Sequence, residues 1–504
     1  MLAVVSLDAT DPARLDRLVG EGRMPNLAAL RERGRHHRVE VSRLLALMEP
    51  STFYTVAMGV PPEAHGRCLP FTWDPQSMRM RAAARPALPA VWDRMTRAGL
   101  RSLVIDAYEI GEPVEIDGAF LRGLQQRNRV SVPEANRPRE LGLEARRALG
   151  PAPILNEVYG RPTASRLRRE REGLLLGGLR PAEAVEWLLP RVEPDLLWVT
   201  MLSAHVAGHR FWNLSQASGD TAGLEGTLDD VYAAVDEGLG RIAQALPDGA
   251  DLLVSSPVGM GENPSRIDLL DAMVESVVAG GDAPAPGVER RPSSLWRLRG
   301  RVPSGLRERV ADLLPERAAL GLMLRMGTPR RDWSRTRVIC VPSDPNGYLR
   351  LNLKGREAAG VLEVADVPPF VERLREGLKS FEDIEGGAAV AEVHDLFTDV
   401  KNGELASEVD HLPDVLVEWV PRPATQVSGV SSPRHGTIRR AGGVGGPTGR
   451  SGGHVADAWV VAVPGRGGSI ADGPPAQLED VVATACARLG ADDEGLTGKP
   501  LIVG

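Results

Sequence analysis

Cysteine is nearly absent from this sequence of 504 residues. The three that occur, Cys68, Cys340 and Cys486, lie far apart. An odd and scattered set argues against a disulfide framework and against a cysteine-based zinc site. No apolar run approaches the length of a membrane span, so we expect no membrane partner. The apolar segment 2–7 has no basic leader before it, and we therefore expect a cytoplasmic protein.

Lysine is also scarce. Only four of the 60 basic residues are lysine, which we interpret first as a coding bias. The net charge of −7 gives no general reason to expect a nucleic-acid partner. The basic run over residues 290–301 is interpreted as solvated surface. Apolar residues make up 42% and charged residues 25%, as in an ordinary globular protein. The length fits one large domain with insertions as well as two domains, and the oligomeric state stays open.

Short, continuous apolar runs recur along the chain, and helical stretches separate most of them. The runs cover residues 2–7, 102–105, 196–200, 252–254, 415–417 and 459–463. Runs without polar alternation are typical of strands that are buried on both faces. The sequence therefore predicts an α/β fold with a mainly parallel central sheet and helices on both faces.

Two stretches have the character of insertions. Residues 111–190 are rich in arginine and proline with helical pieces, and residues 265–335 contain the basic run. We therefore expect a core in three parts, 1–110, 191–264 and 336–504, interrupted by two cap-like inserted segments.

Polar side chains stand where several of the expected strands end or begin, and ligands gather at strand ends in an open α/β sheet. Asp8 ends the first run, His205 and His209 follow the run 196–200, and His454 precedes the last run. Two histidines four residues apart lie on one face of a helical turn. A third histidine after the glycine-rich segment 442–453 can complete a tripod that leaves a fourth position open for water, as in catalytic zinc sites. The alternative is an ordinary polar pocket without a metal.

The order and spacing of further motifs carry a family resemblance. The motifs cover residues 4–9, 24–27, 58–66, 205–212, 256–261, 351–357, 413–417 and 451–454. Together they resemble the alkaline-phosphatase superfamily, in particular its phosphodiesterase and nucleotide-pyrophosphatase branch. That family normally binds two metal ions, usually zinc, and a threonine or serine nucleophile attacks phosphorus.

The resemblance implies that one metal site survives in altered form. The family's first site, an Asp and two His, falls on His205, His209 and His454. Of its second site Asp8 remains, but the Asp-His pair is replaced by Pro257 and Val258. We therefore expect one zinc ion, held by a histidine tripod with an open coordination position, with Asp8 as the remaining acidic ligand.

The nucleophile position falls on Glu49 when counted back without a gap from residues 65–66, although a slip of one or two residues would place Ser51 or Thr52 there. A carboxylate at this position could act as a general base toward water or as a metal ligand. Together with Asp8 it would form a two-carboxylate site in which burial or like charge raises one pKa. The alternative is that Glu49 fills the site of a lost function, in an ion pair with an arginine.

Two functions are compatible with these residues. The first is a divergent metal-dependent hydrolase, similar to phosphodiesterases and nucleotide pyrophosphatases, in which one zinc ion acts on a small-molecule phosphate ester with Glu49 or Asp8 assisting. The second is an inactive descendant that binds a ligand or partner, which Pro257 and Val258 favour. Retention of three metal-binding ring nitrogens favours the enzyme.

Three other polar positions are interpreted as structural. His65 is expected to fix a turn, Asp236 to pack on a helix, and the segment 355–357 to stabilise the fold. His435 lies close in sequence to the glycine-rich segment, but we interpret it as part of a surface loop.

Overall fold

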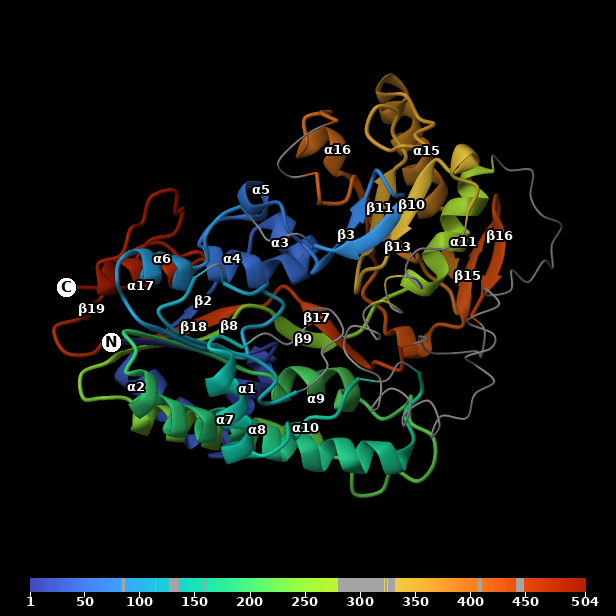
Figure 1. Ribbon diagram of the computed structural model, residues 1–504. Coiled ribbons are helices and arrows are strands. Elements are labelled where there is room, and N and C mark those ends of the chain that lie inside the picture. The colour runs from blue at the N-terminus through green and yellow to red at the C-terminus, as the bar shows by residue number, and fades with distance from the viewer. Residues whose placement is uncertain are drawn as a thin grey trace.

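The structure is a computed structural model that describes residues 1–83, 87–113, 115–126, 136–157, 160–279, 321, 324, 331–405, 410–440 and 448–504 (Figure 1). The basic run 290–301, most of the segment 265–335 and part of the glycine-rich segment lie outside the described residues. No helix in the described ranges is long and apolar enough to cross a membrane.

A seven-stranded sheet forms the centre of the molecule. Its strand order is β2 (Arg35–Arg38), β18 (Trp459–Val463), β8 (Asp251–Ser256), β1 (Leu2–Leu7), β7 (Leu196–Met201), β5 (Ser102–Ile105) and β6 (Gly118–Leu121). The pairs β8–β1, β1–β7, β7–β5 and β5–β6 are parallel, whereas β18 and β2 join antiparallel at one edge. The predicted α/β fold with a mainly parallel central sheet is confirmed.

Alternate side chains of the strands enter two different hydrophobic cores. In β1, Ala3, Val5 and Leu7 face one core, while Leu2 and Val4 face the other. This follows from the two-residue period of a strand, and it explains why the apolar runs have no polar alternation.

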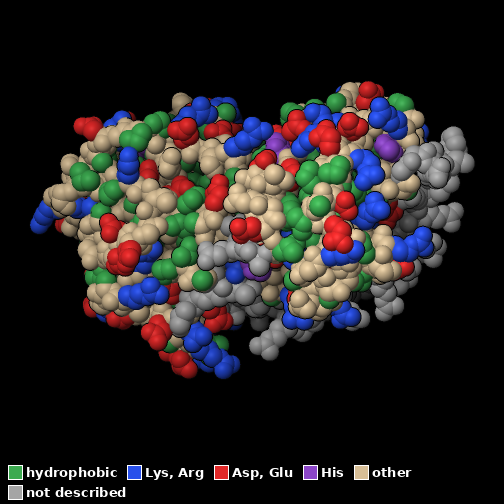
Figure 2. Space-filling model, turned by 90° about the horizontal axis from the view of Figure 1, so that it is seen from above, with side chains coloured by type: hydrophobic (Ala, Val, Ile, Leu, Met, Phe, Trp, Pro, Cys, Tyr) green, Lys and Arg blue, Asp and Glu red, His purple; other side chains and the backbone are tan. Residues whose placement is uncertain are grey.

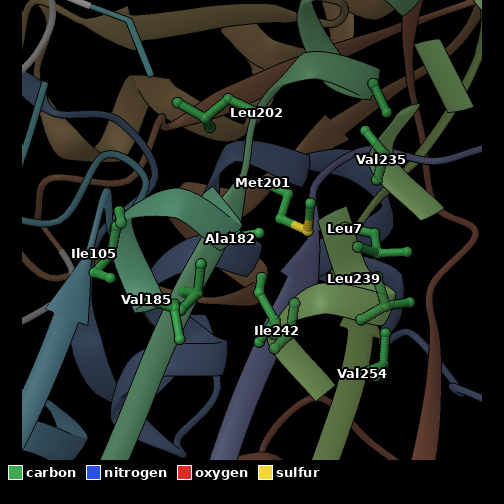
Figure 3. Packing of buried hydrophobic residues seen from close by; sticks show 14 of the residues in the cluster. Leu7, Ile105, Ala182, Val185, Met201, Leu202, Val235, Leu239, Ile242 and Val254 are labelled. Carbon is green, nitrogen blue, oxygen red and sulfur yellow. The ribbon is translucent and has the colours of Figure 1, made fainter. Parts of the chain in front are cut away.

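Helices cover both faces of the sheet (Figure 1). One face carries α1 (Pro12–Gly20), α2 (Pro25–Arg33), α7 (Arg139–Leu149), α8 (Ala164–Val192), α9 (Ser203–Phe211) and α10 (Thr227–Ala245). The other carries α4 (Thr52–Met58), α6 (Val91–Arg97) and α17 (Asp480–Leu489). Figure 3 shows Leu7, Met201 and Val254 of the sheet beside Leu239 and Ile242 of α10.

The range 111–190, which we expected to be inserted, contributes to this central fold. Strand β6 forms an edge of the sheet, and α8 packs on its face through residues such as Val185 and Leu188. The arginines and prolines that suggested an insertion lie in and around a long helix with one apolar side.

A smaller second lobe is built from the described residues between 267 and 440. Its antiparallel sheet has the order β10 (Val338–Val341), β11 (Gly347–Leu351), β14 (Val415–Trp419) and β13 (Val390–Asp395). Helices α11 (Ile267–Val278) and α15 (Val367–Lys379) pack against it in a separate hydrophobic cluster. The apolar run 415–417 is therefore a strand, but it pairs in the second sheet and not in the central one. An apolar run shows burial and does not identify the neighbouring strand.

The segment 355–357 belongs to a buried ion network in this lobe. Asp414 accepts hydrogen bonds from Arg356 Nη2 at 2.6 Å and Lys401 Nζ at 2.8 Å, and Glu357 Oε1 accepts from Arg350 Nε at 2.7 Å. Burial alone would raise the pKa of Asp414, but the Lys401 and Arg356 charges hold it far below its ordinary value. These contacts agree with the structural interpretation of this segment.

The two lobes meet along an apolar seam. Leu47, Met48 and Cys68 of the first lobe share one cluster with Tyr348 and Leu416 of the second. Met48 directly precedes Glu49, so the seam lies beside one of the expected site residues.

On the face seen in Figure 2, acidic and basic side chains are interspersed, as is typical of a solvated surface.

Candidate metal centre

The expected site residues converge at the ends of the central strands. Asp8 directly follows β1, and His205 and His209 lie one turn apart in α9, which begins two residues after β7. His454 lies in β17 (Gly452–Val455), which pairs antiparallel with β9 (Gly259–Glu262). Glu49 begins the short 3₁₀ helix η1 (Glu49–Ser51) before α4.

Two glycines allow α9 to approach the hairpin strands β17 and β9 closely, which brings the third histidine to the other two. A Cβ atom on Gly452 would lie 2.2 Å from the carbonyl oxygen of Gly208, and a Cβ atom on Gly208 would lie 2.6 Å from Met260 Cγ. Both distances are too short for real carbon contacts. The absence of a side chain at Gly452 therefore lets β17 contact α9, and its absence at Gly208 lets Met260 of β9 pack against the same helix.

The three histidines present one ring nitrogen each to a common point. His205 Nε2 lies 3.0 Å from His209 Nε2 and 3.0 Å from His454 Nε2. The ligand nitrogens all lie within 4.8 Å of one another. Among the described residues, these three histidines form the one group of three or more histidine, cysteine or acidic side chains whose ligand atoms lie close enough to hold a metal ion.

Each histidine uses its other ring nitrogen for a hydrogen bond to an oxygen. The distances from Nδ1 are 2.7 Å to Asp8 Oδ2 for His205, 3.0 Å to the Gly452 carbonyl oxygen for His209, and 2.6 Å to Glu49 Oε1 for His454. A carbonyl oxygen and an ionised carboxylate only accept hydrogen bonds, so each Nδ1 carries the proton as its donor. This assignment leaves a lone pair on every Nε2, as binding of a metal ion by three neutral imidazoles requires.

The surroundings shift the pKa values of these groups in different directions. Burial, and then the charge of Arg450, lower the pKa of His209 well below its ordinary value and keep that ring neutral. Burial would also lower the pKa of His454, but the charge and hydrogen bond of Glu49 outweigh it and raise that pKa. Burial raises the pKa of Glu49 to about 7, against the opposing charge of His454. The charges of His454 and Glu49 therefore oppose the effect of burial on each other's pKa.

The two carboxylates have different surroundings. Asp8 is fully buried and contacts His205, whereas Glu49, which is 3% exposed, contacts His454. Glu49 Oε2 is buried and has no hydrogen-bond partner in the described part of the chain. The structure thus places both carboxylates against metal-site histidines and leaves one oxygen of Glu49 available.

An apolar cluster stands where the resemblance places the family's second metal site. Val258 packs with Ala9, Phe53 and Met260, and Ser256 Oγ donates to the Val258 carbonyl oxygen at 2.9 Å. Apolar side chains of this kind provide no metal ligand. The side chains that surround Val258 are therefore apolar as well, in agreement with the replacement of the Asp-His pair in the sequence.

The hydroxyls that a register slip would place at the nucleophile position are directed to the backbone. Ser51 Oγ donates to the Arg67 carbonyl oxygen at 2.5 Å, and Thr52 Oγ1 donates to the Glu49 carbonyl oxygen at 2.6 Å. Glu49 is the residue of this segment whose side chain contacts the histidines. The geometry thus follows the ungapped count.

An ion cluster next to the histidines was not predicted from the sequence. Arg450 donates from Nε and Nη2 to both oxygens of Glu157, at 2.6 and 2.5 Å, and from Nη1 to Asp344 at 3.2 Å. Burial would raise the pKa of Glu157, but the charge of Arg450 outweighs it and lowers the pKa strongly. These three residues come from three distant segments, so their meeting could not be read from local spacing.

Tyr108 is a further residue near the histidines that the sequence did not single out. Its hydroxyl lies 3.4 Å from His205 Nε2, and the two ring centroids are 4.9 Å apart. It follows β5, and the rule that ligands gather after parallel strands could have identified it.

The remaining polar candidates lie outside the centre. His65 Nδ1 accepts from the Arg67 backbone amide at 3.0 Å, in agreement with a turn-fixing role. Asp236 accepts from the Leu27 amide at 2.7 Å and so fixes the start of α2. His435 lies in the turn between β15 (Gly429–Ser432) and β16 (Gly436–Arg439), where it stacks on Phe381.

Comparisons with known proteins give similarity at the level of solved structures. No family model matches the sequence, and no curated protein matches it. A phosphonoacetate hydrolase from Sinorhizobium meliloti 1021, in complex with phosphonoformate, is similar over 97% of this chain and 95% of that chain, with 16% identity and a TM-score of 0.49. Murine ectonucleotide pyrophosphatase/phosphodiesterase 5 is similar over 99% of this chain and 97% of that chain, with 11% identity and a TM-score of 0.48. The human protein of that name gives 10% identity and a TM-score of 0.48.

Proposed function

We propose that this chain is a divergent hydrolase of the alkaline-phosphatase superfamily that acts on a small-molecule phosphate ester or a related ester with a single metal ion. His205, His209 and His454 would hold the ion. One observation carries the proposal: all three Nδ1 atoms donate to oxygens, so three Nε2 lone pairs converge on one point. The ordered sequence motifs support the family assignment.

The residues fit zinc. Three imidazoles oriented by outer hydrogen bonds to carboxylates or a carbonyl are a common zinc ligand set, and they leave a coordination position open. When bound, zinc supplies Lewis acidity to an ester oxygen and makes water a better nucleophile at neutral pH.

The two carboxylates would have different roles. Asp8 contacts His205 Nδ1, so we propose that it orients this ring, whereas the resemblance implied direct metal binding. Glu49 orients His454 with Oε1 and keeps Oε2 without a hydrogen-bond partner in the described residues. Because its pKa is about 7, Glu49 can accept or release a proton near neutral pH, as a general base does.

A second function, ligand or partner binding without catalysis, is favoured by a specific observation. Val258 and its apolar neighbours stand where the resemblance places a second metal, and the hydroxyls of Ser51 and Thr52 are directed to backbone oxygens. Phosphoryl transfer with one metal also lacks one of the two metal ions that stabilise negative charge on the attacking and leaving oxygens in the family mechanism.

The test is the metal content of the purified protein, measured by plasma mass spectrometry for the wild type and for His205→Ala and His209→Ala. We expect about one zinc per chain in the wild type and its loss in both variants. His435→Ala is the matched control, because this histidine lies in a hairpin turn away from the centre and should leave the zinc content unchanged.

The other outcomes separate the alternatives. Two metals per chain would contradict the loss of the second site. No metal after zinc has been supplied would refute the hydrolase and leave the binding protein. If zinc is present, hydrolysis of phosphodiesters, phosphomonoesters and other esters is measured, with Glu49→Gln as the control for proton transfer.

A further inference from the structure

A buried tyrosine of the second lobe has an unused hydroxyl. Tyr348 is the second residue of β11 and is 1% exposed, and its hydroxyl has no hydrogen-bond partner in the described part of the chain. Burying a hydroxyl without a partner is unfavourable, so such a group indicates a ligand or an ordered water.

A buried acceptor with the same deficiency lies across the seam. Glu49 uses Oε1 for His454, while Oε2 is buried and unpartnered among the described residues. The two groups are complementary, because the phenol can donate a hydrogen bond and the carboxylate can accept one.

Three observations place these groups at the same part of the seam. Met48, which precedes Glu49, shares a hydrophobic cluster with Tyr348. Asn346 Nδ2, two residues before Tyr348, donates to the Leu47 carbonyl oxygen at 3.0 Å. Burial, and then the charge of Glu49, raise the pKa of Tyr348, so the two side chains lie within range of electrostatic interaction.

We propose that Tyr348 and Glu49 form a subsite for one hydroxyl oxygen, which accepts a hydrogen bond from Tyr348 and donates one to Glu49 Oε2. The source of this oxygen is either water or a hydroxyl of the substrate. The subsite gives the second lobe a direct part in the metal centre. With a substrate hydroxyl as the source, the inference rests on the proposed hydrolase.

The local charges favour a neutral hydroxyl over an anionic oxygen. Asp344 lies near both groups, since its charge raises the pKa of Glu49 and of Tyr348. An ionised phosphate oxygen would meet these two carboxylates and has no proton to donate to Glu49, whereas a hydroxyl can donate one. We therefore expect the subsite to hold a neutral hydroxyl oxygen and not a phosphate oxygen.

The test compares Tyr348→Phe with the wild type as zinc-loaded, full-length protein. A crystal structure without substrate reveals whether an ordered oxygen lies within hydrogen-bond distance of both groups. Binding of glycerol 1-phosphate relative to methyl phosphate, measured by calorimetry, detects the use of a substrate hydroxyl. Tyr232→Phe is the matched control, because Tyr232 is also 1% exposed but its hydroxyl accepts from the Asp11 amide at 2.9 Å.

An ordered oxygen in the wild type that disappears in Tyr348→Phe supports the subsite with water as its occupant. A preference for glycerol 1-phosphate that falls about three- to tenfold in Tyr348→Phe, with zinc content unchanged, supports a substrate hydroxyl as the source. An empty site together with the same ligand preference in both proteins refutes the inference. Loss of the proposed function is distinguishable, because a protein without zinc can still show the bridging oxygen.

Discussion

The Nδ1 partner of each histidine determines how tightly that ring holds a proton. His209 donates to a backbone carbonyl and has a lowered pKa, whereas His454 donates to Glu49 and has a raised pKa. A metal can bind only to an unprotonated Nε2, so protons compete with the metal most strongly at His454.

Glu49→Gln is expected to shift the pH dependence of zinc binding. The Gln oxygen can still accept from His454 Nδ1, but it carries no charge, so the pKa of His454 falls. Zinc affinity decreases as the pH falls through the pKa of His454, and this decrease should therefore begin at a lower pH in Glu49→Gln than in the wild type. Competition with a chelator between pH 5 and about 8 measures both curves. An unchanged curve would show that Glu49 does not control this proton.

At the level of single residues, local spacing identified the histidines but not their surroundings. The interval between His205 and His209 is one helical turn, and counting from residues 65–66 identified Glu49. Arg450 reaches the ion cluster beside His209 through the tertiary fold and has no local pattern that marks it, whereas Tyr108 follows β5 and the strand-end rule could have identified it.

Among the elements, the contact between α9 and β17 determines whether the tripod is complete. We expect Gly452→Ala to separate the two elements, because its Cβ would lie 2.2 Å from the Gly208 carbonyl oxygen. Overpacking of this kind costs about 1–3 kcal/mol. His454 should then move away from His205 and His209, so that zinc content falls together with the thermal midpoint.

The control for this variant is Gly473→Ala. Gly473 is exposed, and a Cβ atom added there meets no atom within 4 Å. Full zinc content and an unchanged midpoint in Gly452→Ala would show that β17 does not need this close approach.

The elements themselves were more predictable than their partners. The runs 2–7, 196–200 and 252–254 became neighbouring parallel strands, because apolar runs of this length indicate strands buried on both faces. The run 415–417 also became a strand, but in the other sheet. Strand pairing depends on contacts across long sequence separations, which a local pattern does not encode.

In the whole molecule, Arg450 joins parts of the chain that are far apart. It precedes β17, and its partners are Glu157, at the end of the segment 136–157 of the first lobe, and Asp344, in the turn between β10 and β11 of the second. The lobes therefore meet at the metal centre through charge as well as along the apolar seam.

Arg450→Met should destabilise the protein and alter the centre together. It leaves the carboxylate of Glu157, whose side chain is 26% exposed, without its two hydrogen bonds, at a cost of about 1–3 kcal/mol. Because the charge of Arg450 lowers the pKa of His209, that pKa should rise and zinc affinity should fall at acidic pH. Urea unfolding of the zinc-free protein measures the first effect. In a double-mutant cycle, Glu157→Gln should recover part of the loss, because it removes the uncompensated charge. Additive effects of the two substitutions would show that the pair is not coupled and that the arginine acts on the lobes in another way.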